Sequence, residues 1–129
     1  MKHGRHLKVM GKGASTLLGD VDAVRTFLEE LVVGLGMRAL GAPIMHDVPL
    51  DLAKMNVEPF EDEGGVTGTV VLSTSHAAVH TWPARHFFIM DVFSCRDFDP
   101  AVVVKALHFV FGAFDLKLVE VDCDYDPSA

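Results

Sequence analysis

Two segments of the chain repeat their apolar residues with a period of about 3.6 residues, which predicts two amphipathic helices. The first segment follows Asp20 and Asp22, either of which is a suitable N-cap. Gly34 and Gly36 are expected to end this helix. Its apolar positions are Val21, Val24, Phe27, Leu28, Leu31, Val32 and Leu35. A helix with one apolar face must pack that face against another layer of the protein.

The second helix is expected to begin at Asp99 and Pro100, an N-cap followed by proline at the first helical position, and to end at Gly112. Around the two helices lie β-rich runs separated by Gly, Pro and Asp, at residues 5–10, 38–46, 66–73, 77–82, 87–95 and 116–123. Hairpin-like neighbours and only two helices favour an antiparallel sheet over a doubly wound parallel one. We therefore predict an α+β fold, a two-layer sandwich with a mainly antiparallel sheet and both helices on one face.

Length and composition limit the number of domains and the kinds of partner that the chain can have. The chain has 129 residues, 50% of them hydrophobic, which suits a single domain over residues 1–129. Its formal net charge of −7 argues against a nucleic-acid partner. A signal peptide or membrane-spanning run is not evident, so we expect a cytoplasmic protein without a membrane partner. Cys95 and Cys123 form no CxxC pair, which argues against a disulfide framework or structural zinc.

The stretch LSTSHAAVHTWP, residues 72–83, is unusually polar for the end of a strand. On an extended chain His76 and His80 share one face, because side chains alternate with a period of two. The following run ends at Cys95, and a hairpin would return it toward Ser75. We therefore expect serine, histidine and thiol to converge.

Three chemistries use such a set of side chains. The first is zinc binding, and the candidate ligands are His76 and His80 with His86 or Asp91. This set lacks the HExxH and CxxC patterns that make a zinc motif specific. The second is hydrolysis with Ser75 or Cys95 as nucleophile, but no GxSxG elbow is present. The third is self-processing, in which a serine hydroxyl attacks the peptide bond before it.

The runs GGVTGTVVLSTSHAAVHTWP (residues 64–83), DVFSC (residues 91–95) and GRHL (residues 4–7) contain many fixed-spacing matches to one family. The chain resembles the S-adenosylmethionine decarboxylase proenzymes, specifically their small bacterial class. The resemblance runs from residue 4 nearly to the end of the chain, and its specificity lies in residues 65–95. It implies the fold of these decarboxylases.

The resemblance implies that the chain cleaves itself between Thr74 and Ser75, into residues 1–74 and 75–129. The Ser75 hydroxyl would attack the Thr74 carbonyl, and elimination and hydrolysis would leave a pyruvoyl group at the new N-terminus. By analogy with the family, His80 is the base and Thr67 holds the developing oxyanion.

The pyruvoyl group is then the covalent cofactor, and the resemblance implies no separate cofactor and no metal. It would form a Schiff base with the substrate amine and act as an electron sink during decarboxylation. The family assigns the proton returned to the substrate carbon to the cysteine that matches Cys95. A homodimer and a role in spermidine and polyamine biosynthesis are also implied.

Three positions depart from the family pattern. Thr74 replaces a glutamate and Thr67 replaces a serine, and neither change removes the groups that processing needs. Ala84 replaces the glutamate that holds the ribose hydroxyls of S-adenosylmethionine. Losing two charge-assisted hydrogen bonds would cost roughly 2–5 kcal/mol of binding free energy for S-adenosylmethionine. The identity of the substrate is therefore open.

Two alternatives therefore accompany S-adenosylmethionine decarboxylation. The same chemistry could act on ornithine or arginine, whose cationic side chain would meet Glu58, Glu61, Asp62 or Glu63. The chain could instead be an unprocessed, non-catalytic regulatory homologue. The substrate-binding candidates are Phe60, as the ring nearest to the position that stacks on adenine, Glu61, Glu63, His76 and Trp82.

Overall fold

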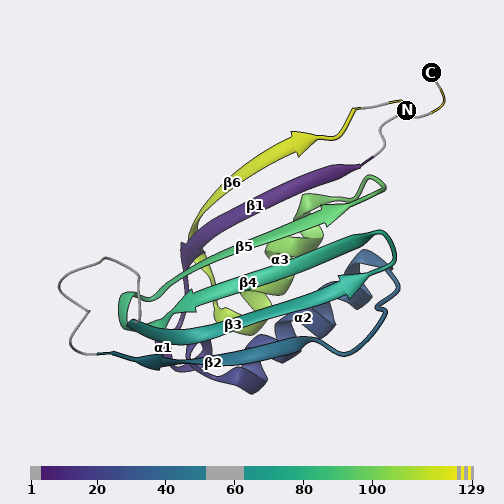
Figure 1. Cartoon of the computed structure of the whole chain (residues 1–129). Coiled ribbons are helices and arrows are strands. Elements are labelled where there is room, and N and C mark those ends of the chain that lie inside the picture. The colour runs from purple at the N-terminus through teal and green to yellow at the C-terminus, as the bar shows by residue number, and fades with distance from the viewer. Residues whose placement is uncertain (1–3, 52–62, 125, 127, 129) are drawn as a thin grey trace.

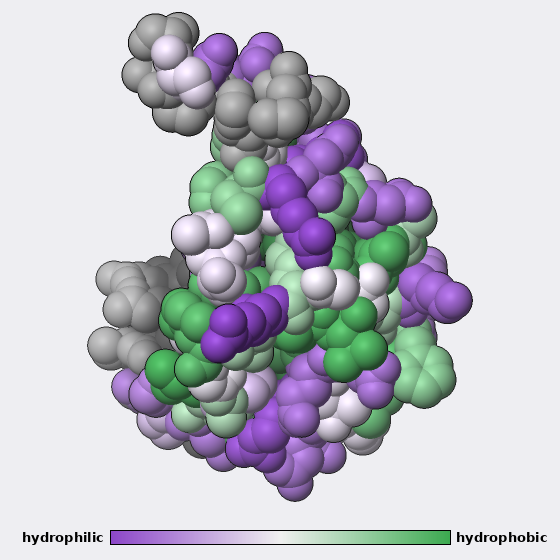
Figure 2. Space-filling model, turned by 90° about the vertical axis from the view of Figure 1, so that its right-hand side faces the viewer, coloured by the Kyte–Doolittle hydropathy of each residue, from purple (hydrophilic) through white to green (hydrophobic). Residues whose placement is uncertain are grey.

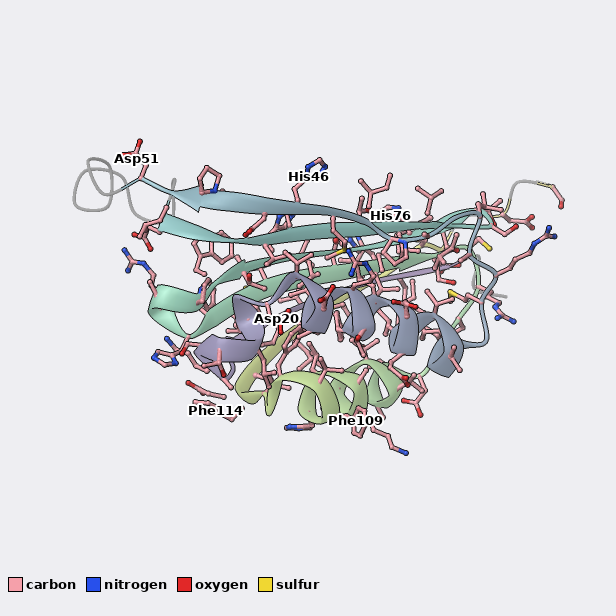
Figure 3. The ribbon with its side chains drawn as sticks, turned by 90° about the horizontal axis from the view of Figure 1, so that it is seen from below. Asp20, His46, Asp51, His76, Phe109 and Phe114 are labelled. Carbon is pink, nitrogen blue, oxygen red and sulfur yellow. The ribbon has the colours of Figure 1, made fainter. Side chains whose placement is uncertain are left out.

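The computed structural model describes residues 4–51, 63–124, 126 and 128. Six antiparallel strands form one sheet in the order β2-β3-β4-β5-β1-β6, and the helices cover one of its faces (Figures 1 and 3). The elements are β1 (Arg5–Lys12), α1 (Ser15–Leu18), α2 (Val21–Leu35), β2 (Ile44–Leu50), β3 (Glu63–Leu72), β4 (Ser75–Trp82), the 3₁₀ turn η1 (Pro83–Arg85), β5 (Phe87–Ser94), α3 (Pro100–Phe111) and β6 (Phe114–Asp122). The predicted two-layer α+β sandwich is confirmed.

The two long helices begin and end as their capping residues predict. Asp20 accepts hydrogen bonds from the first turn of α2, and Asp99 does the same for α3. Gly36 and Gly112 end these helices in the left-handed conformation. The expectation that Gly34 helps to end α2 was wrong, because the helix continues through it to Leu35. The short helix α1 was not predicted.

The strand expected at residues 38–46 is displaced along the chain. Ala39 forms only an isolated bridge to Leu72, and β2 begins at Ile44, directly after Pro43, which has no N–H to donate. The strand then continues to Leu50, beyond the predicted end at residue 46. Pro49 is tolerated there because β2 is an edge strand.

The hydrophobic core lies between the sheet and α2 and α3. Alternate residues of the strands point into it, as the burial pattern of β5 illustrates, where Phe88, Met90 and Val92 are buried. Phe111 of α3 packs against Phe88, with ring centroids 6.2 Å apart. The helix-facing side of the sheet is therefore buried in the hydrophobic core.

The other face of the sheet, which we call the open face, is not covered by the helices. His46 projects from it, on the side away from the helices (Figure 3). Its exposed apolar side chains include Ile44, Val71, Val119 and Val121. Hydrophobic residues also reach the surface among hydrophilic ones at the end of the molecule drawn in Figure 2. Among the described residues, no helix is long and apolar enough to span a membrane.

Candidate active site

The sequence LSTSHAAVHTWP folds into the turn between β3 and β4 and into β4 itself. Leu72 pairs with Ser75, so Ser73 and Thr74 alone form the hairpin turn. Thr74 has a φ of 54°, in the left-handed region that β-branched residues rarely adopt. The unfavourable conformation immediately precedes the bond expected to break, and such backbone strain is concentrated at functional sites.

Ser75 and Cys95 meet beside this turn, as the sequence predicts. The Cys95 backbone N–H donates a hydrogen bond of 3.2 Å to the Ser75 Oγ. The Thr74 Oγ1 lies 2.9 Å from the Cys95 Sγ and 2.7 Å from the Ser73 carbonyl oxygen. The Thr74 hydroxyl, more than the Ser75 hydroxyl and the backbone, lowers the pKa of the exposed Cys95 thiol. We call Thr74, Ser75 and Cys95 the turn cluster.

Thr67 and His80 form a second cluster, on the open face. They are register partners on β3 and β4, and the Thr67 Oγ1 lies 3.1 Å from the His80 Nδ1. Both line a cavity of about 130 Å³, together with Val48, Glu63, Gly64, Thr81 and Trp82. The contact fixes the orientation of the imidazole, whose other nitrogen is then directed away from Thr67.

The expected convergence of Ser75 with His80 within one chain was wrong. The two residues are five positions apart on β4, which is roughly 16 Å along a strand. They also lie on opposite faces, because Ser75 is buried on the helix side and His80 is exposed on the open face. Serine and thiol therefore meet in one protomer, but the histidine expected to act as base stands apart from them.

The remaining substrate-binding candidates occupy different places. His76 lies on the open face next to Ser75, and its ring stacks on Phe93 with centroids 5.7 Å apart. Trp82 stacks on Phe87 at 5.5 Å and lines the cavity. Phe60 and Glu61 lie outside the described residues, as do Glu58 and Asp62.

Glu63 forms an ion pair that the sequence did not reveal. The Arg85 Nε and one terminal guanidinium nitrogen donate to its two carboxylate oxygens, at 2.5 and 2.6 Å. The Glu63 side chain is only 2% exposed, and the pairing raises the pKa of Arg85. Ala84, the position of the missing glutamate, is exposed on η1. Glu63 is thus charge-compensated, which weakens its case as a partner for a cationic substrate side chain.

Two residues of the motif hold the architecture together. A Cβ on Gly65, whose φ is 146°, would lie 1.9 Å from the Thr81 carbonyl oxygen, so the position requires glycine. The buried Thr81 hydroxyl accepts from the Val66 N–H at 2.9 Å and donates to the Leu18 carbonyl at 2.7 Å. Thr81 therefore joins β3 and α1, a role that sequence analysis missed because its partners come from other elements.

The structure does not assemble the zinc or the hydrolase alternative. Across residues 4–51 and 63–124, no group of three or more His, Cys, Asp and Glu side chains is placed to hold a metal ion. In the described part of the chain, no histidine ring forms a hydrogen bond with Ser75 or Cys95. The turn cluster combines the Ser75 hydroxyl, a preceding residue in the left-handed conformation and an exposed thiol of lowered pKa.

Comparison with known proteins supports the resemblance to the S-adenosylmethionine decarboxylases. A family model described as S-adenosylmethionine decarboxylase matches residues 5–123. The S-adenosylmethionine decarboxylase proenzyme of Carboxydothermus hydrogenoformans is 48% identical over 113 residues, 85% of this chain and 77% of that protein. The proenzyme of Syntrophomonas wolfei is 43% identical over 120 residues, 92% of this chain and 84% of that protein.

A solved structure has the same fold. The adenosylmethionine decarboxylase of Aquifex aeolicus aligns with a TM-score of 0.71 at 19% identity, covering 99% of this chain and 96% of that one. Both the expected fold and the resemblance read from the motif around Ser75 are confirmed.

Proposed function

The chain belongs to the S-adenosylmethionine decarboxylase family, and on this basis we propose that it removes the carboxyl group of S-adenosylmethionine as carbon dioxide. The product would be the aminopropyl donor for spermidine synthesis. The observation that carries the proposal is the turn cluster, which places a serine hydroxyl, a strained preceding residue and a thiol together at the matching motif positions.

Self-processing would begin with the Ser75 hydroxyl. Its oxygen attacks the Thr74 carbonyl carbon, and the Thr74–Ser75 amide becomes an ester as the nitrogen leaves. Loss of the Ser75 α-proton then breaks the Cβ–O bond, releasing residues 1–74 with a free carboxyl end. The remaining dehydroalanine hydrolyses, with loss of ammonia, to a pyruvoyl group at the start of residues 75–129.

The residues around Ser75 fit such a group. Position 75 follows a two-residue turn, and its Oγ already accepts a hydrogen bond from the Cys95 N–H. A pyruvoyl group supplies an electron sink for decarboxylation without a dissociable cofactor. The Cys95 thiol would return a proton to the substrate carbon, and its position next to Ser75 supports this role.

Two protomers would complete the site. The open face carries the apolar residues Ile44, Val71, Val119 and Val121, and two such sheets can pack face to face. Because Thr67 and His80 lie on this face and apart from Ser75, we propose a homodimer in which they serve the turn cluster of the partner. Each site would then take its serine and thiol from one protomer and its Thr67–His80 pair from the other.

Two measurements test this function. Intact mass spectrometry under denaturing conditions should show two chains divided between Thr74 and Ser75, the second bearing a pyruvoyl end. The processed enzyme should release carbon dioxide from carboxyl-labelled S-adenosylmethionine and not from ornithine or arginine.

The alternatives predict different results. Release from a basic amino acid alone would transfer the proposal to that substrate class, while a permanently intact, inactive chain would indicate a regulatory homologue. The bidentate Arg85–Glu63 pair disfavours the basic amino acids, because it already compensates Glu63.

A further inference from the structure

A row of three rings crosses the open face and ends beside the expected cleavage site. His6 of β1, Phe93 of β5 and His76 of β4 are register partners in adjacent strands. The Phe93 ring stacks on the His76 ring, with centroids 5.7 Å apart and planes at 25°, and the His6 ring meets Phe93 edge-on at 6.2 Å. Because His76 directly follows Ser75, the row connects β1 and β5 to the residue after the processing serine.

A hydrogen bond holds the far end of this row. The His6 Nε2 lies 2.8 Å from the Asp91 Oδ2, and both side chains are partly buried. Asp91 lies two residues before Phe93 on the same face of β5. Since β5 lies between β4 and β1, the two histidines flank Phe93 from the two neighbouring strands. The Phe93 ring is thus supported by the fixed imidazole of His6 while it packs against the ring of His76.

Chain cleavage would remove other constraints on position 75. In the precursor, Ser75 is bonded to Thr74 in the hairpin turn, and its Oγ accepts a hydrogen bond from the Cys95 N–H. The proposed chemistry breaks the bond to Thr74, and the Oγ atom leaves with residues 1–74. A chain end frays unless other contacts hold it. The group left at position 75 would be attached to the protein only through the backbone nitrogen of His76.

We infer that Phe93 is a positioning residue for the pyruvoyl end and acts through the stacked ring of His76, an inference that rests on the proposed function. Cross-strand aromatic pairs stabilise neighbouring strands of a sheet. This pair holds the residue whose backbone carries the reactive group, so it limits the directions in which that group can point. Misplacement of a reacting group by about 1 Å can lower a rate by about 100-fold. Loss of the stack should therefore lower kcat more than it changes KM.

Hydrogen exchange at the start of β4 tests this role without measuring catalysis. Processed Phe93→Leu should exchange the amides of residues 76–79 about 3- to 10-fold faster than the processed wild type, because one support of the chain end is lost. In the uncleaved Ser75→Ala background the same substitution should change exchange much less, since the closed hairpin still holds the strand. Phe93→Tyr keeps the ring and should exchange like the wild type. Phe114→Leu, the same change at an exposed ring on β6, is the matched control.

Steady-state kinetics of the processed variants is the second test. Phe93→Leu should lower kcat about 10- to 100-fold, with a KM for S-adenosylmethionine within about threefold of the wild type. Phe93→Tyr should recover most of the rate. His76→Leu breaks the same contact from an exposed position, so it tests the inference if Phe93→Leu does not fold. The double variant should lose no more than about a factor of two beyond the weaker enzyme of the two single variants, because only one stack is removed.

Wild-type exchange and wild-type kcat in processed Phe93→Leu would overturn the inference. Equal acceleration of exchange in the cleaved and uncleaved forms would also overturn it, because the ring would then support the sheet in general. Failure of the proposed function is distinct from these results. It would appear as an uncleaved wild type, or as a cleaved wild type that releases no carbon dioxide from S-adenosylmethionine.

Discussion

The hydroxyl oxygen of Thr74 lies 2.9 Å from the sulfur of Cys95, so the residue before the bond expected to break also sets the acidity of the thiol expected to act afterwards. In the uncleaved chain this contact is the largest cause of the lowered Cys95 pKa. One side chain, that of Thr74, therefore affects both proposed steps: chain cleavage before Ser75 and the later proton transfer by Cys95.

Replacing Thr74 with valine should raise the Cys95 pKa, because the shape is kept and the hydroxyl is lost. In a Ser75→Ala, Cys123→Ala background the chain stays uncleaved and Cys95 is its only thiol. The rate of alkylation by iodoacetamide follows the thiolate fraction. The rate–pH curve of Thr74→Val should therefore lie at higher pH than that of the Thr74 parent, and Thr74→Ser should stay near the parent. Superimposed curves for valine and threonine would contradict the assigned cause.

Replacing Ser75 with alanine should abolish both chain cleavage and decarboxylation, because no other group supplies the attacking oxygen and the pyruvoyl carbon atoms. Ser73→Ala changes the same turn but not the nucleophile, and its product should still separate into two chains by mass spectrometry. An uncleaved wild type with full decarboxylase activity would rule out the pyruvoyl mechanism altogether.

Mixing two inactive variants should restore activity if each site draws on two protomers. A heterodimer of Ser75→Ala with His80→Ala keeps one site in which both residues are native. Random pairing of equal amounts should give about a quarter of the wild-type activity, as expected for two sites related by a two-fold axis. If Ser75 and His80 act within one chain, co-expressed variants will remain as inactive as either variant alone.

Replacing Thr81 with valine should destabilise the protein by about 1–3 kcal/mol, because the Val66 N–H and the Leu18 carbonyl lose their buried partner. Urea unfolding of the Ser75→Ala form measures this without interference from cleavage. Thr81→Ser retains the hydroxyl and should lose much less stability. A Thr81→Val protein as stable as its parent would show that the motif threonine is not structural.

Local sequence signals predicted the parts of the fold that depend on neighbouring residues. The caps Asp20 and Asp99 and the C-terminal Gly36 and Gly112 act within one turn of their helices, so the sequence nearby is sufficient. Alternation along β4 also correctly placed His76 and His80 on one face.

Contacts between elements were harder to foresee. The Arg85–Glu63 pair joins residues 22 positions apart and depends on the path of η1, which no local pattern specifies. The same alternation that aligned His76 with His80 placed Ser75 on the opposite face, yet the expected convergence overlooked the length of strand between Ser75 and His80. The motif identified the residues of the chemistry without showing that they form two clusters.

The position of the Thr74–Ser75 bond at the tip of the β3–β4 hairpin has a consequence for what the processed protein would be. Residues 1–74 contribute β1, β2 and β3, and residues 75–129 contribute β4, β5 and β6. In the sheet, β4 lies next to β3, and β1 lies between β5 and β6, so the ladders β3–β4, β5–β1 and β1–β6 each join a strand of one product to a strand of the other. The two products could dissociate only if the hydrogen bonds of all these ladders broke together, which means that the protein would have to unfold. Maturation would turn one polypeptide into an obligate pair, and the association of its two pieces would add a dependence of stability on their concentration.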